Sequence, residues 1–197
     1  MYLYFVLSNH INNISILPKQ INLTNRFRDA TTNQVVFLTV DGVHCRIYEP
    51  TPFSSGWYSH KFNKAALTYE VAINVRNGHI CWVFGGFRAG VSDLKMTRWG
   101  LHCELPPNEK VIADKGYNGE PDRFITPPLD DNHPMGRYLK LIMARHEVIN
   151  KRIKDWGAMS GIWRHGWESH VVAFEAITQL IQIKMENGDP FPQPFTN

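Results

Sequence analysis

Three acidic side chains stand where they could carry metal-dependent chemistry. Asp41 directly follows the apolar run 35–40, and Asp114 directly follows the short apolar run 110–113. Ligand crevices form at the strand ends of open α/β sheets, so two aspartates placed there can meet at one edge. Glu147 lies in a segment with apolar residues at helical spacing, which places it near the face that packs on the sheet. The sequence thus predicts that three carboxylates converge.

Converging carboxylates repel each other, and a divalent cation is the usual way to hold them together. Mg²⁺ prefers hard carboxylate oxygens together with water and substrate phosphate. Two such ions about 3.5–4 Å apart can clamp the attacking and leaving oxygens of a phosphoryl transfer. With water as the nucleophile, this reaction would cleave a DNA strand. With a 3′-hydroxyl as the nucleophile, it would transfer one strand to another. Simpler interpretations stay open, because an Asp after a strand is commonly a turn residue and Glu147 with Lys151 matches a surface ion pair.

The apolar pattern also predicts the elements that would position these acids. We expect strands over 35–40, 43–49, 69–75, 79–84, 110–113 and 124–126. Asn77-Gly78 predicts a hairpin turn, and Gly85-Gly86 predicts the end of the strand that follows it. We expect helices over about 92–104 with Ser92 as N-cap, through the stripe of Leu139, Ile142, Ile149, Ile153 and Trp156, and over 168–186. This order predicts an α/β fold with a mixed sheet flanked by helices.

Length and composition restrict the class of protein. The 197 residues predict one domain, and the Asn- and Thr-rich residues 1–34 are interpreted as an N-terminal arm or remnant. No apolar run is long enough to span a membrane, so we expect no membrane partner. The three cysteines form no CxxC pair and the N-terminus lacks a signal-peptide pattern, which predicts a reducing compartment and no secretion. A net charge of +3 does not by itself require a nucleic acid partner.

Five short blocks surround the acids in order along the chain. They are 40–42 with 59–62 and 67–71, Gly-rich 85–93, Ala113-Asp114-Lys115-Gly116-Tyr117, 145–154, and 164–179. Together they resemble the DDE-type transposases of the PIF/Harbinger group, over about residues 35–190. The resemblance implies a ribonuclease H-like DDE endonuclease domain at 35–190, followed by a tail at 191–197.

The same resemblance implies the activity and its partners. It makes Asp41, Asp114 and Glu147 the catalytic, metal-binding acids of a nuclease that holds two Mg²⁺ or Mn²⁺ ions and cleaves DNA in the nucleus. Full-length relatives carry a helix-turn-helix-like region before this domain, and no helix pair is legible in residues 1–34. A Myb-like DNA-binding protein acting in trans would then supply target recognition. A second copy of the chain is another candidate partner.

Several further residues are predicted to support the reaction. Cations that could contact phosphates are Lys61, Lys115, Arg145, Lys151 and Lys154. Residues 145–165 carry five basic and two acidic side chains, a net +3 that fits either a DNA-binding surface or a solvated helix face. Asn150 could hold the Glu147 carboxylate or a metal-bound water. Asp93 is interpreted either as an acid that supports the site or as a charge that stabilises the start of its helix.

Two alternatives to an active DNA nuclease remain. A domesticated, catalytically silent derivative could keep the fold and bind DNA or a protein. A ribonuclease H-like enzyme acting on RNA is the other, and the Asp114-Lys115-Gly116-Tyr117 block favours the transposase branch over it.

Overall fold

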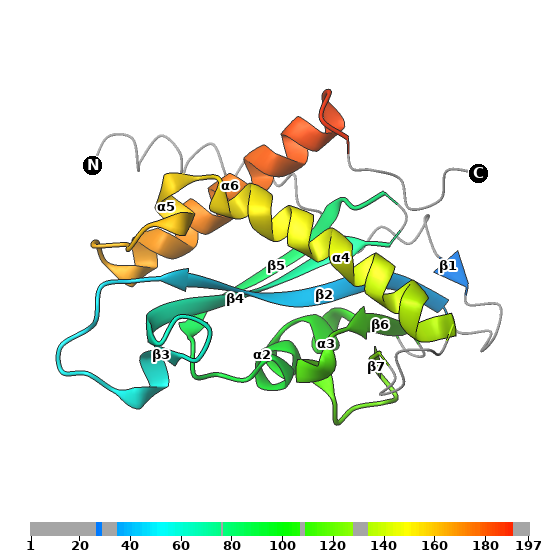
Figure 1. Cartoon of the computed structure of the whole chain (residues 1–197), viewed down its shortest axis with the longest axis horizontal. Helices are drawn as coiled ribbons and strands as arrows, with labels where there is room; N and C mark the ends of the chain where they lie inside the picture. The colour runs from blue at the N-terminus through cyan, green and yellow to red at the C-terminus, as the bar shows by residue number, and fades with distance from the viewer. Residues whose placement is uncertain (1–26, 29–34, 76, 107–108, 128–133, 191–197) are drawn as a thin grey trace.

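The computed structural model describes residues 27–28, 35–75, 77–106, 109–127 and 134–190 (Figure 1). Most of the predicted N-terminal arm and all of the predicted tail lie outside the described residues. The described strands are β1 Phe27–Arg28, β2 Val35–Arg46, β3 Tyr58–Ser59, β4 Lys64–Asn74, β5 Ile80–Arg88, β6 Glu109–Ala113 and β7 Phe124–Ile125. The α-helices are α2 Asp93–Trp99, α3 Leu101–Glu104, α4 Pro134–Lys154, α5 Gly157–Ser160 and α6 Trp167–Glu186, and the 3₁₀ turns are η2 Ser55–Trp57 and η3 Lys115–Tyr117.

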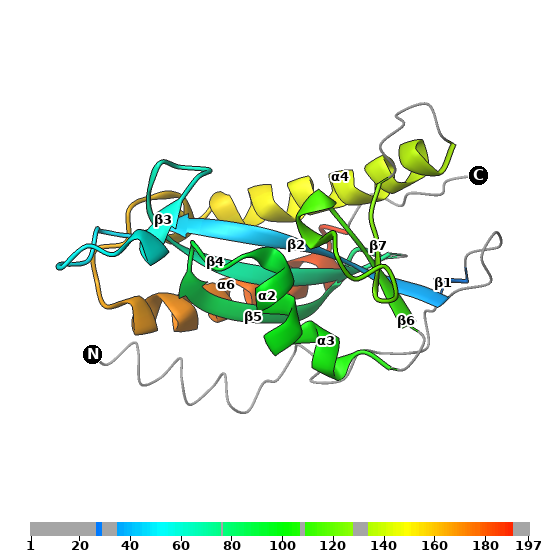
Figure 2. The ribbon, with the colours of Figure 1, turned by 90° about the horizontal axis from the view of Figure 1, so that it is seen from below.

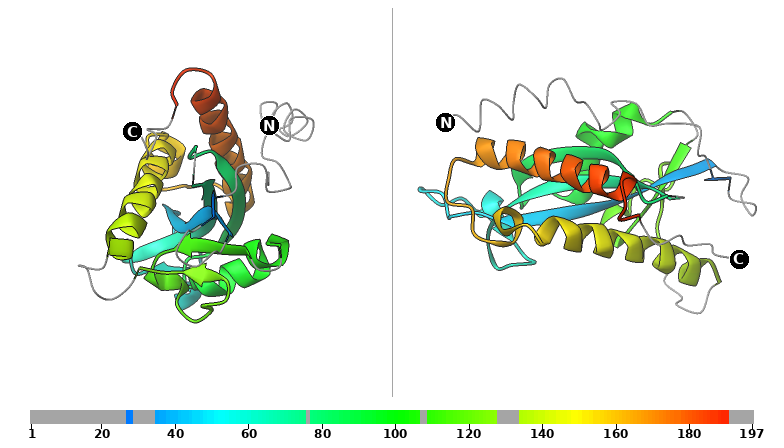
Figure 3. Two further views of the ribbon diagram at one scale, coloured as in Figure 1. Left: turned by 90° about the vertical axis from the view of Figure 1, so that its right-hand side faces the viewer. Right: turned by 90° about the horizontal axis from the view of Figure 1, so that it is seen from above.

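One mixed sheet organises the molecule. Its main strands lie in the order β5-β4-β2-β6-β7, with β2, β4 and β5 antiparallel and β6 and β7 parallel to β2. Helices α4 and α6 cover one face, and α2 and α3 lie against the other (Figures 1 and 2). The end-on view in Figure 3 separates these two layers clearly. The predicted α/β fold of ribonuclease H-like class is therefore confirmed. Among the described residues, no helix combines the length and apolarity needed to cross a bilayer.

Strand β2 is longer than the sequence predicts. We expected one strand to end at Asp41-Gly42 and a second to cover 43–49, but β2 runs unbroken from Val35 to Arg46. Nine consecutive residues, 38–46, pair antiparallel with β4. Gly42 remains in the strand because its pairing with Glu70 outweighs its weak strand propensity. As a consequence, Asp41 is a residue of the strand itself and not of a turn.

The hairpin of β4 and β5 is confirmed, but β5 does not end where we predicted. Its pairing continues through Gly85-Gly86 as far as Arg88. The register shifts between Thr68 and Tyr69, and Gly85 and Gly86 have φ of +150° and +83°. A Cβ on Gly85 would lie 2.6 Å from the Tyr69 Cα. The two glycines therefore form a bulge inside the strand, which is a normal role of glycine in sheets.

The helix predicted over about 92–104 is two helices. Ser92 caps α2 as predicted, since its side chain accepts a hydrogen bond from the Lys95 amide. The helix then breaks at Gly100, where a Cβ would lie 2.4 Å from Cδ1 of Phe84 on β5. Close packing of the α2–α3 junction on the sheet thus requires glycine and interrupts the helical hydrogen bonding.

The apolar stripe of α4 is confirmed in its first four members. Leu139, Ile142, Ile149 and Ile153 are at most 2% exposed. The fifth member, Trp156, does not belong to the stripe: it is 42% exposed and lies in extended backbone between α4 and α5. The helix ends at Lys154, so helical periodicity no longer positions Trp156. With the stripe buried on the sheet, Asn150 of α4 lies beside Asp41 on β2.

Candidate active site

Asp41 and Asp114 each follow the last residue pair of two parallel strands. The last paired residues of β2 and β6 are Val40 and Ala113, and each aspartate follows directly. Burial, together with the negative charge of Asp114, raises the pKa of Asp41 to about 6. Asp114 is exposed and caps η3, where its Oδ1 accepts a hydrogen bond from the Gly116 amide at 2.7 Å. The structure thus brings together the two acids that the strand-end pattern predicted.

Asn150 on α4 is the residue that contacts Asp41. Its Nδ2 donates to the Asp41 Oδ2 at 3.0 Å, and the Gly42 amide donates to Oδ1 at 2.8 Å. Both hydrogen bonds favour the ionised carboxylate and lower its pKa against the effect of burial. We expected Asn150 to hold the Glu147 carboxylate or a metal-bound water, and the structure shows its amide on the Asp41 carboxylate. Its Oδ1 is buried and has no hydrogen-bond partner among the described residues.

Asp93 approaches the pair from the opposite face of the sheet. A Cβ on Gly42 would lie 2.7 Å from the Asp93 Oδ1, and a Cβ on Gly116 would lie 2.8 Å from its Oδ2. Two glycines therefore leave the room that this carboxylate occupies. Burial raises the pKa of Asp93 to about 6, with a further contribution from Asp114. Asp93 thus belongs to the acidic cluster in addition to occupying the first turn of α2.

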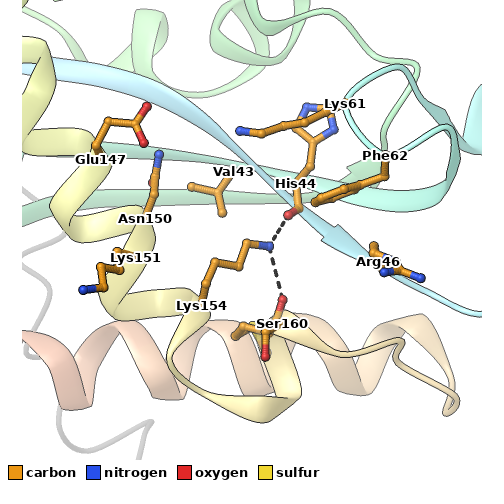
Figure 4. A pocket seen from close by; sticks show the side chains of 11 residues that line it. Val43, His44, Arg46, Lys61, Phe62, Glu147, Asn150, Lys151, Lys154 and Ser160 are labelled. Atoms are coloured by element: carbon orange, nitrogen blue, oxygen red, sulfur yellow. Dashed lines mark hydrogen bonds between the residues drawn. The ribbon is translucent and has the colours of Figure 1, made fainter.

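Glu147 lies apart from that cluster. It is exposed on α4, one turn before Asn150, and its side chain borders a cavity (Figure 4). In the described part of the chain, no three His, Cys, Asp or Glu side chains are placed to hold an ion together. The donor chemistry nevertheless fits a hard divalent cation, because the Asp41 and Asp114 carboxylates and the orphaned Asn150 Oδ1 are all oxygen ligands.

The cavity beside Asn150 measures about 390 Å³ and lies between β2, the loop after β3, and helices α4 and α5 (Figure 4). Its lining consists of Val43, His44, Arg46, Lys61, Phe62, Glu147, Asn150, Lys151, Lys154, Met159 and Ser160. Four of these side chains are cationic and one is acidic. Burial and two nearby lysines lower the pKa of His44 to about 4, so this histidine is neutral at pH 7. We did not predict a role for the side chains of His44, Arg46 or Phe62, because they meet only where β2 and the loop after β3 come together.

The five predicted phosphate contacts divide into two groups. Lys61 and Lys151 are exposed at the cavity, and Lys115 is exposed beside Asp114. Arg145 is only 6% exposed and donates to the Val75 carbonyl, so its guanidinium lies under α4. The Lys154 ammonium donates to the carbonyls of His44 and Met159, which ties β2 to α5. The burial of Arg145 is at odds with its predicted phosphate contact, whereas Lys154 lines the cavity and its phosphate contact stays a prediction.

Comparison with known families decides the relationship. A family model described as DDE superfamily endonuclease matches residues 40–154, more than half of the chain. The chain belongs to the DDE superfamily endonucleases. No curated protein and no solved structure matches it significantly. The predicted relationship is thus confirmed at the level of the superfamily, and the PIF/Harbinger subgroup stays a prediction.

The match to the DDE superfamily endonucleases contains the whole candidate site. It begins at Val40, immediately before Asp41, and ends at Lys154, the last residue of α4. Asp93, Asp114 and Glu147 lie inside it, while α5 and α6 lie outside. Family membership supports a transposase-type nuclease that acts on DNA, and members of this superfamily generally use divalent metals. The two elements beyond the match complete the wall of the cavity and the cover of the sheet.

Proposed function

We propose that this chain is a divalent-metal-dependent DNA endonuclease that cleaves phosphodiester bonds and transfers strands as transposases do. The observation that carries the proposal is the pair Asp41 and Asp114 on adjacent parallel strands, with Asn150 directed onto Asp41. In this proposal Asp41 and Asp114 hold Mg²⁺ or Mn²⁺, two ions in all, and Glu147 completes the ligand set. Bound there, the metal would activate the nucleophilic oxygen and stabilise charge on the phosphate.

The residues of the chain have distinct tasks in this reaction. Asn150 orients the Asp41 carboxylate, because its amide donates to one of the two carboxylate oxygens. Lys61 and Lys151, exposed at the cavity, contact phosphates of the DNA strand and offset the charge of the acids. Asp93, whose pKa is raised in part by the charge of Asp114, adds negative charge beside the other two aspartates and so favours a cation there. Glu147 lies on α4 one turn before Asn150, so in this proposal its exposed side chain supplies the last ligand.

Nicking of supercoiled plasmid in Mg²⁺ or Mn²⁺ tests the proposal. Asp41→Asn, Asp114→Asn and Glu147→Gln each should lower the nicking rate by at least about 100-fold, since each removes a charged ligand. Asp122→Asn is the matched control, because Asp122 is an exposed acid in the loop before β7 and should nick like the wild type. Nicking that persists without metal, or in Asp114→Asn, would contradict the proposed site.

A second candidate function is a catalytically silent DNA-binding derivative. It is favoured by one observation, namely that no three acidic side chains of the described residues are gathered to hold an ion. The same protein samples distinguish the two functions. A well-folded protein that binds DNA, shows no nicking and gains no thermal stability from Mn²⁺ would establish the silent derivative. A metal-dependent rise in melting temperature together with nicking would establish the nuclease.

A further inference from the structure

The cavity beside Asn150 has a lining that phosphate binding alone does not require. Val43, Phe62 and Met159 form an apolar part of the wall, and Lys61 and Lys151 lie at its border. A surface that only follows the DNA backbone needs cations and polar groups. Apolar and aromatic side chains next to cations are instead typical of sites that hold a base together with its phosphate.

The size and position of the cavity fit a single nucleotide. Its volume of about 390 Å³ lies within the range of about 300–1,000 Å³ that is usual for sites that enclose small organic molecules. Asn150 borders the cavity and donates to Asp41, so the cavity lies next to the acidic cluster. A nucleotide in the cavity would therefore be a near neighbour of the phosphate held at the acids.

The walls of the cavity are held in place by the fold. The Lys154 ammonium lies 5.6 Å from the centre of the Phe62 ring and donates to the carbonyls of His44 and Met159. His44 Nδ1 is hydrogen-bonded to the Ser59 hydroxyl at 2.9 Å. Figure 4 shows Phe62 and His44 on one side of the cavity and Asn150 and Glu147 on the other. The aromatic wall is thus positioned before any ligand binds.

We propose that this cavity binds one unstacked nucleotide of the DNA strand, next to the phosphodiester bond that is cleaved. Its base lies against Phe62 and Val43, and Lys61 and Lys151 contact its flanking phosphates. The inference rests on the proposed nuclease function and adds a preference for DNA in which a nucleotide is already unpaired. Pairing and stacking within a duplex hold a base in place, so an unpaired nucleotide enters the cavity at lower cost.

Binding of two labelled DNA duplexes tests the inference, one fully paired and one with a single unpaired nucleotide. Fluorescence anisotropy in Ca²⁺ gives both affinities, and nicking in Mn²⁺ is measured on the same preparations. We expect the wild type to bind the second duplex about tenfold more tightly, since stacking of one base on an aromatic side chain contributes about 1–3 kcal/mol. Phe62→Ala should reduce that ratio to less than about threefold.

Controls separate stacking from damage to the fold and from DNA binding as such. Phe53→Ala is the matched control, because Phe53 is 50% exposed in the preceding loop and does not line the cavity. It should keep the tenfold ratio. Phe62→Leu retains apolar bulk without an aromatic face, so it should fold like the wild type and still lose most of the preference. A free deoxynucleoside monophosphate should compete only at millimolar concentration.

The outcomes distinguish this inference from the function on which it rests. Equal binding of the two duplexes by a wild type that nicks would overturn the nucleotide cavity and leave the nuclease intact. The nucleotide cavity is likewise overturned if Phe62→Ala keeps the preference, or if the free nucleotide competes at micromolar concentration. A wild type that neither binds nor nicks DNA would overturn the nuclease and the cavity together.

Discussion

At the scale of single residues, burial and neighbouring charge set the protonation of the acidic cluster. Asp41 and Asp93 both have pKa values raised to about 6, first by burial and then by the charge of Asp114. A carboxylate whose folded-state pKa lies above its unfolded value favours the folded state when protonated. Without metal, these two residues therefore make the protein less stable as the pH rises from about 4 through about 6.

Metal binding should show the opposite dependence on pH. Divalent ions bind the ionised carboxylates, so protonation competes with them. We expect Mn²⁺ to raise the melting temperature clearly at pH 7.5 and to have little effect at pH 5, where each acid with a pKa of about 6 is about 10% ionised. Thermal melts with and without Mn²⁺ at both pH values measure this, with Asp114→Asn as control. A rise of equal size at pH 5 would contradict the assignment.

The missing side chain of Gly42 is as informative as the acids. A Cβ there would lie 2.7 Å from the Asp93 Oδ1, so Gly42→Ala should displace this carboxylate and lower the free energy of unfolding by about 1–2 kcal/mol. Urea unfolding of Gly42→Ala, Asp93→Ala and the double variant measures the coupling between the two residues.

Gly157→Ala is the control for the cost of an added methyl group, because a Cβ on Gly157 meets nothing within 4 Å. It should not destabilise the protein. If the Gly42→Ala and Asp93→Ala effects simply add, the carboxylate does not occupy the place that Gly42 leaves open.

At the scale of elements, β4 carries a buried acid that the reaction does not use. Glu70 is 0% exposed, pairs with Gly42 in the sheet and accepts a hydrogen bond from Trp82 Nε1 at 3.0 Å. Burial raises its pKa to about 7. The folded protein therefore keeps a proton that the unfolded chain loses between about pH 4.5 and 7, and stability falls with rising pH over that window.

Glu70→Gln should remove this dependence, since the amide oxygen can still accept the Trp82 hydrogen bond without carrying a charge. At pH 8 we expect the variant to be about 1–3 kcal/mol more stable than the wild type, and near pH 4.5 the two should be alike. Chemical denaturation across this pH range is the measurement. Glu104→Gln, at an exposed position on α3, serves as control and should follow the wild type. Greater stability of the wild type at pH 8 would show that the Glu70 charge is favourable.

Helix α4 connects the acidic cluster to the cavity beside Asn150. Its buried stripe packs on the sheet, Asn150 reaches Asp41, and Lys154 ties β2 to α5. His146, which is 1% exposed, is hydrogen-bonded to the Thr39 hydroxyl at 2.6 Å, and burial lowers its pKa to about 3. These buried polar contacts fix the register of the helix on β2, and this register determines which of its residues border the acids.

At the scale of the whole molecule, the distribution of charge determines which surface would bind DNA. The formal net charge is only +3, yet one cavity beside the acids collects Arg46, Lys61, Lys151 and Lys154. The logarithm of affinity for DNA falls with the logarithm of salt concentration in proportion to the number of phosphates that the protein neutralises. Lys61→Gln and Lys151→Gln should therefore each reduce the slope of this relation by about one.

Binding of duplex DNA at several salt concentrations measures the slopes. Lys184→Gln is the matched control, because Lys184 is an exposed cation near the end of α6 that lines a different cavity with Asp189. It should leave the slope unchanged. Equal slopes for all three variants would place the DNA on another face of the molecule.

The sequence by itself determined the elements and the order of the acids. Apolar runs and turn signals depend on neighbours a few residues away, so they predicted β6, β7, the hairpin, the Ser92 cap and the stripe of α4. The Asp41 and Asp114 positions followed for the same reason, since each stands at the end of an apolar run. The local pattern predicted wrong element boundaries where contacts between distant residues set them. The examples are the unbroken β2, the bulge at Gly85-Gly86 and the break at Gly100.

Only the tertiary structure decided which side chains meet. Asn150 reaches Asp41 across 109 positions of sequence, Asp93 enters between two glycines, and Phe62 faces a cavity built from four separate segments. Arg145 and Lys154 resemble surface cations in the sequence, but the docking of α4 on the sheet turns both toward backbone carbonyls. The physical reason is the same in each case: side-chain contacts depend on packing between elements, which local periodicity does not encode.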